Sequence, residues 1–149
     1  MRIFFAKWNA YRTAAVLLLL YCILHSYGAL IATPDFGAQS DAVIRAMRSV
    51  HFTVQEFWNT WYGFYLGFGW FASIFFALSA VELWIIGGID RAQQQLYRSI
   101  CWTLAIAHAV GVGLCIRYFF AAPLLFSSLA TIAIVWGLLS DRRIRRAEA

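Results

Sequence analysis

The sequence has few charged residues. Only 13% of its 149 residues are Asp, Glu, Lys or Arg, whereas 62% are hydrophobic and 18% are aromatic. A soluble domain of ordinary composition is about 45–50% apolar and about 25% charged. A fold of this size has no interior large enough to hide the excess, so lipid must cover much of its surface. The composition therefore excludes an ordinary soluble domain and predicts an integral membrane protein.

Cysteine is also scarce, and its placement excludes a disulfide framework. Cys22, Cys101 and Cys115 all lie in hydrophobic segments and form no CxxC pair. An odd number of cysteines in an apolar setting is typical of buried free thiols. The chain also lacks internal repeats and low-complexity segments, so we expect one transmembrane domain over residues 1–149.

The net charge of +5 is concentrated at the ends of the hydrophobic segments. This is the membrane pattern, and it differs from the basic stripe of a nucleic-acid-binding protein. We therefore expect the lipid bilayer, and no nucleic acid, as a partner.

Four hydrophobic segments are long enough to cross a bilayer, for which about 20 apolar residues suffice. The expected spans are residues 13–33, 62–88, 99–120 and 123–140. Pro34 ends the first, because the residue before a proline is pushed out of the α region. A secretory signal is the alternative for this first segment, but its apolar run is long for one.

Residues 41–60 have a different pattern. Apolar residues recur every three or four positions, at Val43, Met47, Val50, Val54 and Phe57. This spacing predicts an amphipathic helix that lies in the membrane interface or covers the outer mouth of the bundle. The predicted fold is thus all-α: a membrane four-helix bundle with an amphipathic interfacial helix before the second span.

The positions of Lys and Arg predict the orientation. Nine of the twelve lie in the N-terminal segment, the connection between the second and third spans, and the C-terminal tail: Arg2, Lys7, Arg12, Arg91, Arg98, Arg142, Arg143, Arg145 and Arg146. Because basic residues favour the cytoplasmic side, we expect both termini in the cytoplasm.

Ionisable groups inside a span are costly and mark candidate sites. Glu82 can shuttle a proton or pair with Arg98 or Arg12 near the interface, where Trp84 lies beside it. Arg117 is expected to snorkel outward or to hold an anionic group.

His25 and His108 lie on spans that run in the same direction, at depths that differ by only ~5 Å. The two histidines can ligate a haem or a metal, act as acid and base, or each hydrogen-bond a neighbouring helix; His108 has Ser127 and Thr131 as candidate partners. Metal ligation is the weakest of these hypotheses, because zinc ligands are usually closely spaced in loops.

Glycine and aromatic residues are concentrated in the second span. Gly63 and Gly67 form a GxxxG motif, which favours close helix packing within the chain or a homodimer. The aromatic residues Tyr62, Tyr65 and Trp70 can line the mouth of a pocket or form the interfacial belt.

Residues 57–76 read FWNTWYGFYLGFGWFASIFF. This run resembles the F-W-x-F-Y-x-G-F-G segment of a family of small bacterial four-span membrane proteins. The resemblance implies four helices and a bacterial inner (plasma) membrane, and no activity. The layout also resembles the sterol-isomerase and sigma-2-receptor group at the level of fold, without matching any of its motifs.

Three functions fit these patterns. The leading hypothesis is the binding of a lipid, quinone or isoprenoid-like molecule in an intramembrane cavity, with Tyr62, Tyr65 and Trp70 at the mouth and His25 and His108 inside. The second is a membrane-embedded isomerase or other proton-transfer enzyme that uses His108 and Glu82. The third is an interaction subunit that assembles through the glycine-rich second span. We expect no obligatory cofactor, although haem or quinone fits the histidine pair.

Overall fold

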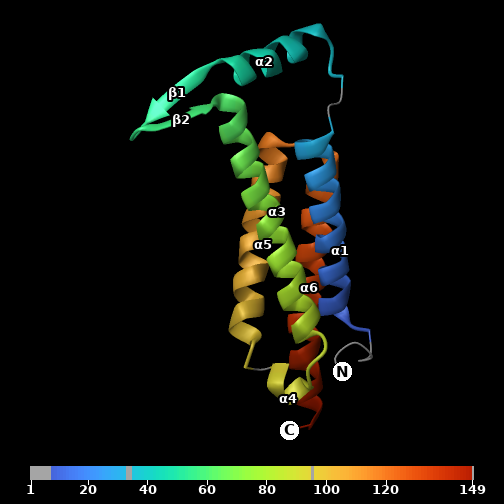
Figure 1. The fold of residues 1–149 in the computed structure, drawn as a ribbon. Helices are drawn as coiled ribbons and strands as arrows, with labels where there is room; N and C mark the ends of the chain where they lie inside the picture. Colours follow the sequence, from blue (N-terminus) through green and yellow to red (C-terminus); the bar gives the residue numbers. More distant parts are fainter. Residues whose placement is uncertain (1–7, 33–34, 95, 149) are drawn as a thin grey trace. The chain divides into compact units, whose positions relative to one another are not determined.

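The computed structural model describes residues 8–32, 35–94 and 96–148 (Figure 1). Four helices in this part of the chain are long and apolar enough to cross a membrane: Ala10–Ile31, Trp61–Ile86, Arg98–Tyr118 and Ala121–Ser140. They confirm the four predicted spans, and each boundary lies within a few residues of the expected one. The shortest of them has 20 residues, which at 1.5 Å per residue is enough to cross the ~30 Å hydrocarbon core.

The four spans are built from five helical elements. The first consists of α1 (Ala10–His25) and a continuing π-helix, η2 (Ser26–Ile31). The second and third are α3 (Trp61–Ile86) and α5 (Arg98–Tyr118), with the short α4 (Arg91–Gln94) between them. The fourth is α6 (Ala121–Glu148), which extends beyond its apolar part. Pro123 lies in its first turn, where a missing N–H is harmless.

Large apolar side chains are exposed along all four spans. Phe71 is 72% exposed, Ile116 70%, Trp136 64% and Ile23 55%. A soluble monomer rarely exposes apolar surface on this scale. The chain is therefore a multi-pass membrane protein whose outward side chains face lipid.

The chain divides into two compact units, to which α1 and α3 both contribute. Unit 1 comprises residues 1–21 and 76–149, and unit 2 comprises residues 22–75. The single domain expected over residues 1–149 stays a prediction.

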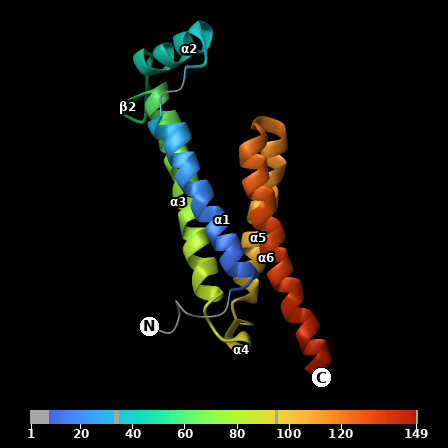
Figure 2. The ribbon, with the colours of Figure 1, turned by 90° about the vertical axis from the view of Figure 1, so that its right-hand side faces the viewer.

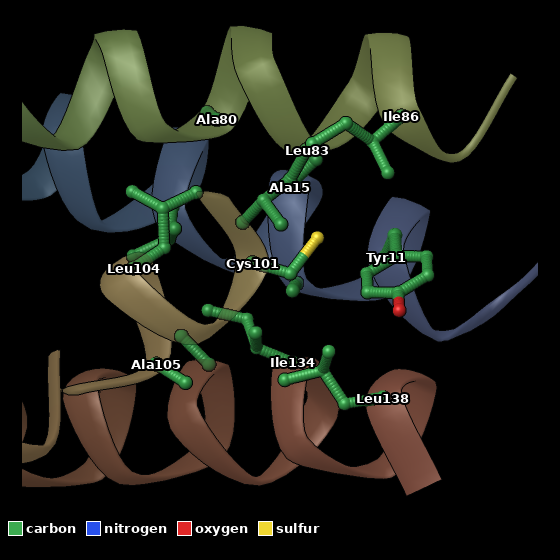
Figure 3. Packing of buried hydrophobic residues seen from close by; sticks show 13 residues of the cluster. Tyr11, Ala15, Ala80, Leu83, Ile86, Cys101, Leu104, Ala105, Ile134 and Leu138 are labelled. Carbon is green, nitrogen blue, oxygen red and sulfur yellow. The ribbon is translucent and has the colours of Figure 1, made fainter. Parts of the chain in front are cut away.

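The hydrophobic core lies in unit 1, where α1, α3, α5 and α6 meet (Figure 3). Leu18, Leu83 and Ile134 are fully enclosed there, next to small residues such as Ala14 and Ala130. In lipid, such interdigitation of large and small side chains supplies the association energy, because the hydrophobic effect does not favour helix–helix over helix–lipid contact. The core supports the predicted four-helix bundle.

Asn9 connects the start of α1 to the end of α3. Its Oδ1 accepts a hydrogen bond from the Arg12 N–H at 3.1 Å, which caps the helix. Its Nδ2 donates to the Gly87 carbonyl at 2.7 Å. The start of α1 and the end of α6 lie at the same end of unit 1 (Figure 2), as an even number of spans requires.

The close helix approaches differ from those expected at Gly63 and Gly67. A Cβ on Gly63 would collide with the side chain of Asn59, four residues earlier in the chain, and one on Gly67 would meet nothing within 4 Å. Three other glycines face side chains of α1 or η2: Gly69 faces Leu30, Gly87 faces Arg12 and Gly137 faces Tyr11. The homodimer through Gly67 stays a prediction.

The amphipathic helix predicted over residues 41–60 is only half correct. The helix α2 (Ala38–Ser49) ends at Ser49, and β1 (His51–Val54) then pairs antiparallel with β2 (Phe57–Thr60). The connecting residues Gln55 and Glu56 have φ values of 49° and 68°. Positive φ at both central residues is the signature of the type I′ turn, which matches the twist of a hairpin. Aromatic and β-branched residues favour the strands and override the helical spacing.

Candidate functional site

Glu82 and His108 both belong to unit 1, and they have different surroundings. Glu82 is exposed on α3, whereas His108 is 2% exposed on α5. The His108 ring lies beside Phe76, with 6.4 Å between ring centroids. Phe76 precedes Glu82 on α3 by about 9 Å at 1.5 Å per residue. This geometry separates the acid and base that the proton-transfer hypothesis needs.

The residues expected as partners of these two groups have interactions of their own. The Arg12 guanidinium lies 4.6 Å from the Trp84 ring centroid, and Arg12 is 2% exposed. The Thr131 hydroxyl donates a hydrogen bond to the Ser127 carbonyl at 2.7 Å. The hydroxyl of Ser127 belongs to a polar group with Tyr21 and Cys115.

A row of aromatic rings in unit 1 ends at His108, whose ring lies beside Phe76. Tyr21 stacks on Phe76 at 4.2 Å between centroids and on Phe126 at 5.6 Å. Together with His108 they form a row of rings from four helices. His108 is thus an enclosed polar side chain at the end of this row, next to Phe76.

Unit 2 contains a hydrogen-bonded cluster around Ser73. The Ser73 Oγ lies 3.0 Å from the His25 Nδ1 and accepts a hydrogen bond from the Ser26 hydroxyl at 2.8 Å. The Cys22 thiol donates to the Ser73 carbonyl at 3.3 Å. We call these four residues the Ser73 cluster. It satisfies polar groups that would otherwise be costly within a span.

The local helix geometry places these groups together. The α-helix α1 changes to the π-helix η2 after His25, and the wider turn is shown by the 2.7 Å bond from Ala32 N–H to the Tyr27 carbonyl. Such π-helical turns occur frequently at functional sites. Gly69 lies one turn before Ser73 and admits Leu30. The missing Cβ at Gly69 therefore lets η2 approach α3.

Ser73 lies near the middle of the second span. Twelve residues separate it from Trp61, the start of α3, which corresponds to ~18 Å. Ser73 is 4% exposed, whereas His25 is half-buried. His25 is thus the member of the Ser73 cluster that combines a polar ring with partial access from outside.

The predicted mouth residues lie on the first part of α3. Tyr62 is half-buried beneath Arg48, whose guanidinium is 4.5 Å from the ring centroid and whose Nη2 donates to the Tyr62 hydroxyl at 3.2 Å. Tyr65 and Trp70 are 47% and 45% exposed. Tyr62 and Tyr65 have ring centroids 6.2 Å apart. Their positions fit an aromatic belt around the first turns of the span.

Arg117 lies near the end of α5 and is exposed. Its guanidinium is 5.4 Å from the ring centroid of Tyr118. An exposed arginine within one turn of the helix end has the position that snorkelling requires.

Metal binding has no structural support within residues 8–32, 35–94 and 96–148. No group of three or more His, Cys, Asp or Glu side chains in these ranges is arranged to hold a metal ion. His25 and His108 belong to different units. A haem held between them stays a prediction.

Sequence reasoning identified His25 as a candidate but missed its contacts with Ser73 and Ser26. The rotation of two helices about their axes decides which side chains face each other, and single-span spacing does not define that rotation. The available signal was a serine near the middle of a largely apolar span.

Comparison with protein-family models, curated proteins and solved structures finds no match to the chain.

Proposed function

We propose that this membrane protein binds an apolar small molecule whose polar group contacts His25. The observation that supports this proposal is the Ser73 cluster, in which a half-buried histidine is held by a buried serine near mid-membrane. Polar side chains at such depth are costly and usually functional.

Ser73 positions the imidazole ring. Its hydroxyl, 3.0 Å from Nδ1, fixes the ring orientation and restricts the tautomer. Ser73 itself is too enclosed to meet a substrate, although its distance from His25 is that of a nucleophile and its base. This enclosure favours binding through the histidine over covalent catalysis through the serine.

The surroundings of His25 define the ligand class. Leu24 and Tyr27, both within two residues of His25, are 53% and 64% exposed, so the adjoining surface is mostly apolar. An imidazole can donate to or accept from a hydroxyl, carbonyl or carboxyl. A lipid, a quinone or an isoprenoid-like molecule combines such a group with a long apolar body.

Native mass spectrometry of the protein released from mild detergent tests the proposal, together with an absorbance spectrum of the same sample. We expect a mass excess that corresponds to one ligand and is lost in His25→Phe. His51→Gln is the matched control, because His51 is an exposed histidine on the hairpin and should retain the ligand. Ser73→Ala should retain less ligand than the wild type. This variant tests the positioning of His25 without removing its imidazole ring.

Other outcomes would overturn the proposal. A clean apo monomer from several mild detergents contradicts ligand binding. An apo dimer supports the interaction-subunit hypothesis instead, and Gly67→Leu should then dissociate it into folded monomers. A ligand that persists in His25→Phe places binding elsewhere in the chain.

A further inference from the structure

We propose that the β-hairpin, residues 51–60, is a membrane anchor that lies in the lipid headgroup region with one defined face toward the lipid. That face contacts the surface of the same bilayer that the protein spans. This inference is independent of any ligand at His25.

The hairpin is fixed to the beginning of the second span. It ends at Thr60 and α3 starts at Trp61, with no intervening residue. The Trp61 N–H also donates to the Val50 carbonyl at 3.3 Å. In Figure 1 the hairpin leaves the start of α3 to the side and not along its axis. A strand pair that crosses the axis of a span lies roughly along the membrane plane.

The strand register assigns side chains to two faces. Phe52 is opposite Asn59 and Val54 is opposite Phe57, so these four share one face. His51, Thr53, Trp58 and Thr60 share the other face, on which His51 stacks on Trp58 at 4.0 Å between centroids. The first set is the apolar face of the hairpin.

The apolar face continues the lipid-facing side of α3. Phe52 packs on Trp61 at 4.6 Å and on Phe64 at 5.6 Å between centroids. Phe64 in turn packs on Phe68 at 4.8 Å. Beyond Phe52, Val54 and Phe57 are 58% and 60% exposed. One apolar surface therefore runs from the span onto the hairpin, and lipid that covers the span also covers the face.

The charges specify how the anchor works. Between residues 35 and 62 there are two arginines and three carboxylates, an excess of one negative charge. Arg48 already stacks on Tyr62. Attraction to anionic lipid therefore does not hold the hairpin, and apolar insertion does. Glu56 at the turn limits the depth to the headgroup region.

The test places a fluorescent label on single cysteines in the full chain, reconstituted into phosphatidylcholine vesicles. The native cysteines are replaced by alanine. Phe57→Cys reports the apolar face, and Thr53→Cys is the matched control on the other face of the same hairpin. Lipids carrying a spin label near the headgroup quench from the membrane, and iodide quenches from water.

We expect lipid quenching to be several-fold stronger at position 57 than at position 53, and iodide quenching to be several-fold weaker. Neither result should change with added phosphatidylglycerol or high salt. Val54→Cys, on the same face as Phe57, must give the same result. Both quenching series are repeated in the chain that retains its native cysteines, and the signal of the labelled wild type is subtracted. This repeat checks that the alanine replacements do not themselves cause the result.

Three results would overturn the inference. Equal iodide quenching at positions 53 and 57 means that the face is in water. Protection at position 57 from both quenchers means that protein, such as a second copy, covers the face. Lipid quenching that requires phosphatidylglycerol means that charge, and not apolar insertion, holds the hairpin.

Discussion

At the scale of single residues, the helices of unit 1 approach closely where a glycine meets a large side chain. A Cβ on Gly137 would lie 2.7 Å from Tyr11 Cε1, and one on Gly87 would lie 2.8 Å from Arg12 Cγ. Real Cβ atoms do not approach so closely, so any larger residue requires the neighbouring side chain or its helix to shift. These two glycines therefore set the separation between α1 and its neighbours α3 and α6.

Gly137→Val should destabilise the protein. Overpacking a well-filled contact costs about 1–3 kcal/mol, and Tyr11 is 4% exposed and has no space to retreat. Thermal unfolding in detergent, followed by size-exclusion chromatography, measures the change. Gly113→Val on α5 is the control, because its Cβ would meet nothing within 4 Å. Equal losses in the two variants would contradict this packing.

The bond between His25 and Ser73 should appear as a coupling energy. Side-chain hydrogen bonds between membrane helices average about 0.6 kcal/mol and reach about 1.7 kcal/mol. A double-mutant cycle of His25→Phe and Ser73→Ala measures the coupling as a difference in free energy of unfolding. Thr103→Val replaces Ser73→Ala in the control cycle, because the Thr103 hydroxyl bonds within its own helix to the Ser99 carbonyl. A coupling no larger than that of the control cycle would contradict the bond.

At the scale of elements, the hairpin shows where sequence reasoning fails. The spacing of Val50, Val54 and Phe57 continues a helical pattern from α2, so periodicity alone predicts one long helix. The turn residues Gln55 and Glu56 are neither Asn nor Gly, and the usual signal of a two-residue hairpin is absent. The remaining signal was the run of Phe, Thr, Val and Trp on either side, which favours strands.

The double variant Gln55→Asn, Glu56→Gly should stabilise the hairpin. Both residues have positive φ, which costs an ordinary L-residue roughly 1–2 kcal/mol, and Asn-Gly removes much of this cost. Slower amide hydrogen exchange in residues 51–60 is the expected result. Glu56→Gln is the control, since it removes the charge and leaves the backbone preference unchanged. Unchanged exchange in the double variant would argue against the I′ turn.

At the scale of the whole molecule, sequence alone predicted the number and limits of the spans. Hydropathy suffices for this, because each backbone group in lipid must be bonded within its own helix. The Ser73 cluster was beyond reach, because it depends on how two helices turn toward each other and on the π-helical turn after His25. The position of His25 in a span indicated a candidate site residue, whereas its partner Ser73 could be identified only from the structure.

The distribution of Lys and Arg also predicts the orientation of the chain in the membrane. We expect the α3–α5 connection in the cytoplasm and the hairpin on the opposite side. A membrane-impermeant maleimide should label Gln55→Cys in intact cells and label Gln93→Cys only after permeabilisation. The reverse pattern would contradict the assigned orientation.

Thermal unfolding with added lipid extract is the most direct test of the proposed contact between His25 and an apolar ligand. Protein stripped by extensive detergent washing is compared with and without extract from its expression host. A ligand at about 100 times its Kd stabilises the folded state by about 2.7 kcal/mol. We expect a rise in Tm for the wild type and His51→Gln, and none for His25→Phe. An equal rise in His25→Phe would contradict the proposed contact.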